Sequence, residues 1–203
     1  MTELEKGPTG RRRGRGARER IISAAQRLFR EQGINRTGMD QLCTAAEVSK
    51  RTAYQHFGGK DELVAEYLRG FDPSVLSGVF DRTDLAPRER LLAAFDVPPT
   101  TPLCPYIAAA VELHDSQHPA SQYARDYKKA VAARLAGTAR EAGAADPEQL
   151  GEQLALLIDG AAARSRVLDA DAFPAAAAIA AVLIDTALPA AAGDDRRPEE
   201  APS

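Results

Sequence analysis

The chain has 203 residues, of which 44% are hydrophobic and 27% charged, with a formal net charge of −3 at pH 7. This balance indicates a globular protein, long enough for one large domain or two small ones. Abundant alanine, absent tryptophan and few β-branched runs favour helices over sheet. No apolar run reaches the length of a membrane span and no secretory leader is visible, so we expect no membrane contact and a cytoplasmic location.

The charge is divided unevenly along the chain. Residues 1–60 hold 13 Lys and Arg against 6 Asp and Glu, a net charge of +7, and the remaining 143 residues carry −10. A basic segment joined to an acidic one indicates that only the basic segment meets a polyanion such as nucleic acid.

Residues 1–16 end in the run GRRRGRG, and six arginines fall within residues 11–20. Gly and Arg cannot build a core, so we expect this segment to be disordered in isolation. It is either a solvated tail or an arm that follows phosphates or enters a minor groove, and a neighbouring DNA-binding motif favours the arm. The cations of the arm are Arg11, Arg12, Arg13, Arg15 and Arg18.

The first predicted helix covers residues 17–32. Apolar residues recur there at the spacing of one helical face, and Gly33 follows as a stop signal. The residues of this face are Ile21, Ala25, Leu28 and Phe29.

Two short helices are predicted next, over about 38–46 and 49–57. Thr37 and Asp40, three residues apart, resemble a capping box for the first of them, and Ser49 is the N-cap candidate of the second. Two short helices joined by a tight turn and braced by a longer helix form a helix-turn-helix, whose second helix enters the major groove of DNA.

Beyond residue 58 the chain continues as helices separated by Gly and Pro. Asp146, Pro147 and Gln149 supply a strong start signal for one of them. The sequence thus predicts an all-α fold of about nine helices. The later helices are expected over about 61–69, 87–95, 106–113, 119–142, from Pro147 to at least Ala161, and over about 171–188.

The run VSKRTAYQHFGGKDEL, residues 48–63, combines apolar residues at helical spacing with a dense set of cations and hydroxyls. With this run at its centre, the segment 18–68 resembles the DNA-binding domain of the TetR family of bacterial transcriptional regulators. The resemblance implies a helix-turn-helix domain at 17–62 and a helical effector-binding and dimerisation domain at 63–189. The flanking segments would be the arm at 1–16 and a disordered tail at 190–203.

The resemblance and the side-chain chemistry together predict the DNA contacts. Thr37 would cap the second helix and bond a phosphate. Lys50 and Arg51, at the start of the recognition helix, would read guanine edges or pair with phosphates. Tyr54 and His56 resemble the phosphate-binding pair of the family. The full predicted set is Thr37, Ser49, Lys50, Arg51, Thr52, Tyr54, Gln55, His56 and Lys60.

Glu47 departs from the family pattern, which has glycine at this place in the turn. Glycine suits a positive φ, so a glutamate there carries strain or forces a different turn. Glu47 also places an acid near the DNA.

The runs LCPYIAAAVELHDSQHPAS and GAADPEQLGEQLALLIDGA resemble one branch of the family. This resemblance implies a pocket among the central helices and a homodimer through the last two. Small residues at 160–163 and 175–181 would let those helices approach closely. The segment 95–103 is shorter than in that branch, which would open or reshape one pocket wall. The candidate pocket residues, equally well explained as core, are Phe80, Phe95, Tyr106, Val111, Tyr123, Tyr127, Leu157 and Arg164.

Other sites are less favoured. His114, Asp115 and His118 raise the alternative of a metal site, but surface or capping histidines are the simpler interpretation. Cys43 and Cys104 are expected to be reduced thiols, with a redox sensor at Cys104 as the alternative. No cofactor is expected.

The predicted function is a dimeric repressor that binds a palindromic DNA operator and is released by a small-molecule effector. A DNA-binding activator or an effector-independent regulator is the alternative. An enzyme or a small-molecule-binding protein is more remote, because the sequence has no nucleophile–base pair and no Gly-rich phosphate loop.

Overall fold

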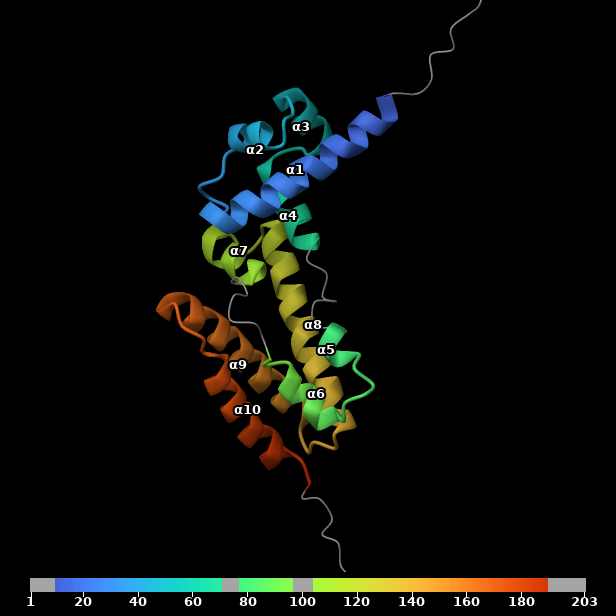
Figure 1. Cartoon of the computed structure of the whole chain (residues 1–203), viewed down its shortest axis with the longest axis vertical. Helices are drawn as coiled ribbons and strands as arrows, with labels where there is room; N and C mark the ends of the chain where they lie inside the picture. The colour runs from blue at the N-terminus through green and yellow to red at the C-terminus, as the bar shows by residue number, and fades with distance from the viewer. Residues whose placement is uncertain (1–9, 71–76, 97–103, 190–203) are drawn as a thin grey trace, which may run out of the picture. The chain divides into compact units, whose positions relative to one another are not determined.

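The computed structural model describes residues 10–70, 77–96 and 104–189, with the backbone alone at 10–15 and 77. These residues form ten α-helices and no strand, so the all-α prediction is confirmed (Figure 1). None of the described helices is long and apolar enough to cross a membrane. The helices are α1 (Gly10–Gln32), α2 (Met39–Ala45), α3 (Lys50–His56), α4 (Lys60–Arg69), α5 (Ser77–Phe80), α6 (Pro87–Ala93), α7 (Pro105–Leu113), α8 (Pro119–Glu141), α9 (Pro147–Leu168) and α10 (Phe173–Ala187).

The helices belong to two compact units. Unit 1 comprises Met1–Val75 and Pro102–Lys129, and therefore holds α1 to α4, α7 and the first half of α8. Unit 2 comprises Leu76–Thr101 and Ala130–Ser203, with α5, α6, the second half of α8, α9 and α10. These units follow packing, and they group α4 and α7 with the helix-turn-helix. The functional boundary between residues 62 and 63 stays a prediction.

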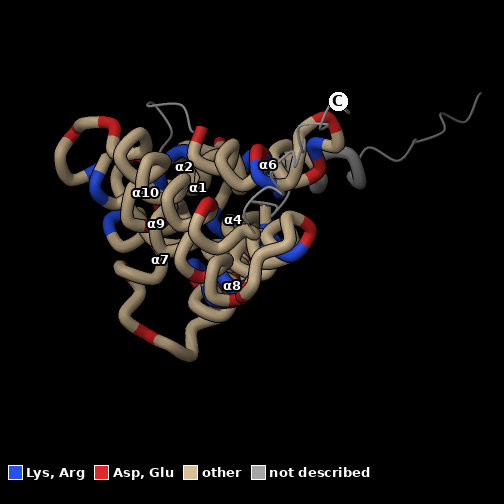
Figure 2. The backbone as a smooth tube through the Cα atoms, turned by 90° about the horizontal axis from the view of Figure 1, so that it is seen from below, with Lys and Arg blue, Asp and Glu red and all other residues tan. Residues whose placement is uncertain are grey.

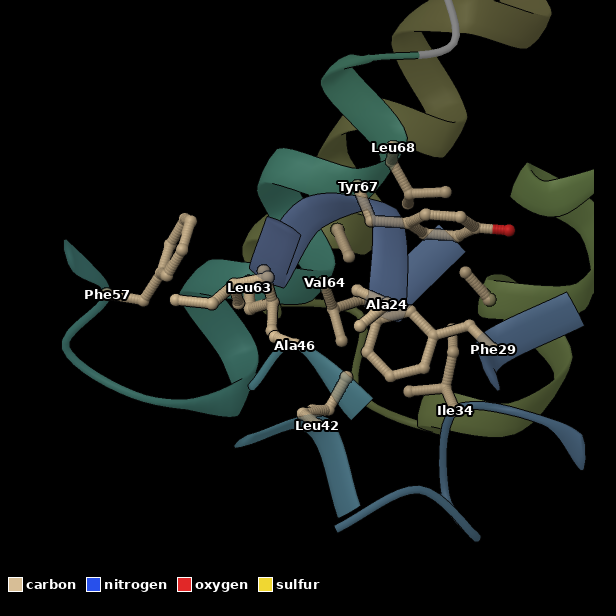
Figure 3. Close-up of a cluster of buried hydrophobic side chains, with 14 of the residues drawn as sticks. Ala24, Phe29, Ile34, Leu42, Ala46, Phe57, Leu63, Val64, Tyr67 and Leu68 are labelled. Carbon is tan, nitrogen blue, oxygen red and sulfur yellow. The ribbon is translucent and has the colours of Figure 1, made fainter. Parts of the chain in front are cut away.

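The core of unit 1 is built around α1, which packs on α2, α3 and α4. Ile21, Ala25 and Phe29 are buried as the helical spacing predicts. The Phe29 ring meets the Tyr67 ring edge-on at 5.2 Å between centroids (Figure 3). Burial raises the pKa of Tyr67 to about 12, because the core disfavours the ionised phenolate.

Helix α7 is fastened to the turn between α1 and α2. Asn35 donates its backbone N–H to Glu112 Oε2 at 2.8 Å and its side-chain amide to the Glu112 carbonyl at 2.7 Å. Tyr106, also on α7, donates its hydroxyl to the carbonyl of Leu68 on α4 at 2.8 Å. These bonds explain why α7 belongs to unit 1. All five tyrosines of the chain, which has no tryptophan, lie in this unit.

The first helix begins earlier than predicted. Its backbone is helical from Gly10, so residues 10–16 are not the disordered arm that their composition suggested. Arginine forms helix almost as readily as alanine, and extending an existing helix avoids the cost of nucleation. The predictions for residues 1–9 and 190–203 lie outside the described residues.

In unit 2, α9 and α10 lie side by side (Figure 1). The predicted start of α9 is confirmed, since Asp146 Oδ1 accepts the backbone N–H of Gln149 at 3.0 Å and Pro147 is the first helical residue. Gly151 lets α9 approach α8, because a Cβ there would lie 2.7 Å from the Ala132 carbonyl oxygen. Helix α5, with only four residues, was not predicted.

Helix α10 carries one charged residue, Asp185, among fifteen (Figure 2). Arg88 of α6 forms a two-pronged ion pair with it, with Nε 2.7 Å from Oδ1 and Nη2 3.0 Å from Oδ2. Further ion pairs join α6 to the end of α8 (Arg90 with Glu141) and α8 to Asp81, and hydrophobic burial contributes beside them. The largest fully buried side chains there are Leu91, Leu135, Leu150, Leu154 and Ile184.

Candidate nucleic-acid interface

The start of α2 differs from the prediction. Gly38 is the N-cap, and its backbone N–H donates to Gln41 Oε1 at 3.1 Å. Thr37 is fully buried; its hydroxyl donates to the Gly33 carbonyl at 2.7 Å and accepts from Gln32 Nε2 at 3.1 Å. Thr37 is therefore not the cap, and its occupied, buried hydroxyl cannot bond a phosphate in this conformation. The pairing of Gly38 with Gln41, three residues on, was the signal that could have located the cap.

The turn between α2 and α3 is a Schellman motif. Glu47 donates its backbone N–H to the Thr44 carbonyl at 3.2 Å, and Val48 donates to the Cys43 carbonyl at 3.0 Å. This geometry needs a left-handed residue, and Glu47 supplies it with φ of 53°. The glutamate thus keeps the family's turn and carries the strain, which for a residue with a Cβ is about 1 to 2 kcal/mol.

Arg20 of α1 supports the same turn. Its Nε donates to the carbonyl of Ala46, the C-cap of α2, at 2.9 Å. Next to it lies an open hollow of about 620 Å³, lined by residues of α1, the turn and α3. Sequence reasoning missed Arg20, because the contact joins residues 26 positions apart. The hollow is lined by Gly16, Ala17, Arg20, Glu47, Val48, Ser49 and Thr52.

Helix α3 begins as predicted at Ser49. The Ser49 hydroxyl accepts the backbone N–H of Thr52 at 3.1 Å, and the two hydroxyl oxygens lie 2.8 Å apart. Ala53 and Phe57 are buried and fix one side of the helix against the core. Figure 3 draws the Phe57 side chain as part of this cluster. The other side of α3 is left to solvent.

The exposed side of α3 presents cations, an aromatic ring and an amide. Lys50, Arg51, Tyr54 and Gln55 are exposed, Tyr54 by 52% although it is a large aromatic residue. His56 is half-buried beside the Phe57 ring. Lys60 is half-buried too, as the first residue of α4. Lys50, Arg51, Tyr54 and Gln55 thus share the solvent-exposed side of α3. Helices α1 to α3 are called the head.

Lys50 forms an ion pair with Asp40, which the sequence pattern placed in a capping box with Thr37 instead. Its Nζ lies 2.6 Å from Oδ1 of Asp40 on the first turn of α2. The hydrogen bond to this carboxylate raises the pKa of Lys50 above its ordinary value. The pair joins the two short helices across the turn.

Arg18, predicted as part of the arm, is held inside unit 1. It pairs with Glu66 of α4 and stacks over the Phe57 ring at 5.5 Å from the centroid. Glu66 also pairs with Arg69, whose guanidinium bonds the Tyr123 hydroxyl. Arg18 is therefore part of a network that connects α1, α4 and α8. The role of Arg18 as a DNA contact stays a prediction, since its side chain is 43% exposed. The side chains of Arg11, Arg12, Arg13 and Arg15 lie outside the described residues.

The comparisons with known proteins agree with this geometry. The model of the family of bacterial regulatory proteins called tetR matches residues 21–67. The crystal structure of a putative TetR transcriptional regulator from Streptomyces avermitilis is 34% identical and covers 84% of this chain and 97% of that one, with a TM-score of 0.76. The chain belongs to the TetR family.

Curated TetR-family relatives include both activators and repressors. The transcriptional activator FasR of Mycolicibacterium smegmatis is 37% identical over 100 residues, 45% of this chain and 46% of FasR. The transcriptional repressor KstR2 of Rhodococcus jostii is 36% identical over 56 residues, 28% of each protein. These alignments span less than half of the relatives' length. The prediction of a transcriptional regulator rather than an enzyme is confirmed.

The predicted effector pocket of this TetR-family protein is divided between the two units. Tyr106, Val111, Tyr123 and Tyr127 belong to unit 1, where the Tyr106 and Tyr127 rings stack at 4.0 Å and Val111 is exposed. The other four belong to unit 2, where Phe80 and Phe95 are buried and Arg164 is exposed. Their role as a pocket stays a prediction. Of the segment 95–103, which the TetR resemblance marked as shortened, residues 97–103 lie outside the described residues.

The alternative sites have structural roles in this member of the family. His118 Nδ1 accepts the backbone N–H of Ala120 at 3.0 Å and so caps the start of α8. His114 ends α7 in a left-handed conformation. The described residues contain no group of three or more metal-ligating side chains. Cys43 and Cys104 are free thiols, and burial raises the pKa of Cys43, which disfavours a reactive thiolate there.

Proposed function

We propose that this TetR-family regulator is a dimeric repressor that places two copies of α3 in successive major grooves of a palindromic operator and is released by a small-molecule effector. Residues 17–62 form the DNA-binding domain and residues 63–189 the effector-binding and dimerisation domain. The protein acts in the cytoplasm. The observation that carries the proposal is α3, whose apolar side is buried while its cationic, aromatic side is exposed.

In this proposal the exposed side of α3 contacts DNA directly. Lys50 and Arg51 read guanine edges or pair with phosphates, since both lie on the first turn of the helix. Tyr54 and Lys60 bond phosphates, and Gln55 is a further contact at the same surface. Thr52, His56 and the arginines at the start of α1 add contacts around it, while Ser49 acts by fixing where α3 begins.

The homodimer forms through α9 and α10. Both helices leave large apolar side chains in solvent: Val167 on α9 is 81% exposed, and Ile179 and Val182 on α10 are exposed as well. Gly160 has open space at its Cβ position, which leaves room for a close helix from a partner. An exposed apolar surface of this kind is typical of an oligomer interface.

The effector acts on the position of α4. Arg69 of α4 bonds Tyr123 of α8, and its neighbour Glu66 pairs with Arg18 of α1. A shift of α8 therefore moves α4, which packs against α1. The effector must prefer the conformation in which the two heads no longer fit the operator. The candidate contacts are the eight pocket residues named above.

Selection from a pool of random DNA duplexes tests the proposal with the full-length protein. We expect an enriched inverted repeat whose half-sites lie roughly ten base pairs apart. A pool that stays random would contradict sequence-specific recognition. A single half-site, together with a monomer mass by light scattering, would contradict the dimer.

An activator is the second candidate, because the relative FasR is named as one. A reporter gene placed behind the selected sequence separates the two. Repression requires that expression falls when this protein is produced, whereas a rise would establish the activator.

A further inference from the structure

Asp40 has no role in the function proposed above, although it lies on the same surface. It is exposed on the first turn of α2, and its Oδ1 is 2.6 Å from Nζ of Lys50 at the start of α3. The two side chains are 74% and 62% exposed. An ion pair so exposed is screened by solvent and adds little to stability, so its main effect is on what Lys50 can bind.

The neighbouring cation provides a contrast. Arg51 is exposed as well, yet it has no ion-pair partner among the described residues. The recognition helix thus begins with one cation held by an acid and one free to reach any anion.

We propose that Asp40 is a positioning residue for sequence reading: it directs Lys50 to a guanine edge and keeps Lys50 off the phosphates. The inference rests on the proposed role of α3 as the DNA-reading helix. Asp40 thereby sets the specificity of the contact that Lys50 makes.

The donor count of Lys50 supports a guanine as its ligand. An ammonium group has three N–H donors and no acceptor. One donor is directed at Asp40, which leaves two for the O6 and N7 acceptors that guanine presents side by side in the major groove. Guanine is uncharged, so it tolerates the carboxylate on the far side of the ammonium group.

A phosphate is a poorer ligand for the same pair. Its negative charge would approach the Asp40 carboxylate, and repulsion between like charges opposes the contact. The paired Lys50 and Asp40 also have no net charge together, so they release few counterions from DNA. Non-specific binding therefore gains little from Lys50 while Asp40 is present.

The test compares variants of the full-length protein on the sequence that the wild-type protein selects. Lys50→Ala identifies the base pair that Lys50 reads, as the position whose discrimination is lost. We expect Asp40→Asn to reduce discrimination at that same base pair about fivefold or more, the lower end of the range for one base contact. It should also raise affinity for random duplex about fivefold and steepen the salt dependence by about one counterion.

Three further variants separate positioning from a structural effect. Asp40→Glu should restore discrimination, because it keeps the carboxylate. Arg51→Ala should relax a different base pair. Asp40→Asn combined with Lys50→Ala should lose no more discrimination than Lys50→Ala alone. Unchanged helicity of each variant by circular dichroism confirms that the head still folds.

The outcomes distinguish the inference from the proposed function. If the wild-type protein selects no sequence, the proposed function fails and the inference with it. If the wild-type protein selects a sequence but Asp40→Asn keeps its discrimination and its affinity for random duplex, the inference alone is overturned. It is also overturned if Lys50→Ala relaxes no base pair.

Discussion

Helices α3 and α10 are packed in the same way but expose opposite kinds of side chain. Each buries small and apolar residues against its neighbours, Ala53 in α3 and Ala180 and Ile184 in α10. Outward, α3 presents cations and a tyrosine, whereas α10 presents Ile179 and Val182. The buried sides of the two helices therefore do not indicate function. The exposed sides do: that of α3 suits a polyanion, and that of α10 suits a second helix.

The largest expected effect comes from making the surface of α10 resemble that of α3. Ile179→Arg together with Val182→Arg should yield a folded monomer, because cations replace the apolar contact. Loss of the second head should weaken operator binding about 100-fold or more. Light scattering and a DNA titration measure the two effects. Ala133→Arg, an exposed site on α8, is the control and should stay dimeric.

Alkaline pH should destabilise unit 1, because Tyr67 is buried in its core. Its pKa is raised to about 12 by burial, against about 10 for an ordinary tyrosine. The stability that its neutral form contributes is complete below pH 10 and is lost as the pH rises through 12. The loss amounts to about 2 to 3 kcal/mol. Urea unfolding at pH 9 to 12 should show this slope in the wild-type protein and not in Tyr67→Phe; an equal slope in both would contradict it.

On the α3 side, Tyr54→Phe with Lys60→Ala removes a hydroxyl and a cation from the exposed surface. Operator affinity should fall about tenfold for all sequences alike, and its salt dependence should become shallower by about one counterion. Titrations at several salt concentrations provide the measurement. Lys129→Ala removes an exposed cation from α8 and should change neither quantity. An unchanged affinity of the double variant would refute the phosphate roles.

The smallest effect concerns the turn that leads into α3. Glu47→Gly should stabilise the protein by about 1 kcal/mol, since glycine adopts the observed φ of 53° without strain. Glu47→Gln keeps the strain and removes the charge, so it should strengthen DNA binding without the gain in stability. Thermal unfolding of both variants tests this division. Equal stability of wild type and Glu47→Gly would show that the turn bears no strain.

Local signals predicted much of the head correctly. The face of α1 with Ile21 and Phe29 and the cap at Ser49 depend on spacing within a few residues, and both are present in the structure. For Glu47 the family pattern left open a strained residue or a different turn, and the positive φ in the structure shows the first. The prediction of Thr37 as the N-cap of α2 was wrong, because the adjacent Gly38 can take the same position. The burial of Thr37 and its hydrogen bond with Gln32 decide between the two residues.

Contacts between distant residues could not be predicted. The ion pair of Asp40 with Lys50 depends on the angle between two helices, and the network of Arg18 joins residues 48 positions apart. Helix α5 is too short to show a periodic pattern. The candidate pocket residues fall in both units, because aromatic composition indicates burial without indicating which core a ring joins.

All five tyrosines lie in unit 1 and the chain has no tryptophan, so intrinsic tyrosine fluorescence reports on unit 1. Intrinsic emission excited in the near ultraviolet originates in that unit alone. A change in emission on adding operator or a candidate effector would therefore report on the surroundings of the head, with no dye attached. Unit 2, which carries the helices of the proposed dimer interface, contributes no tyrosine emission in the same experiment.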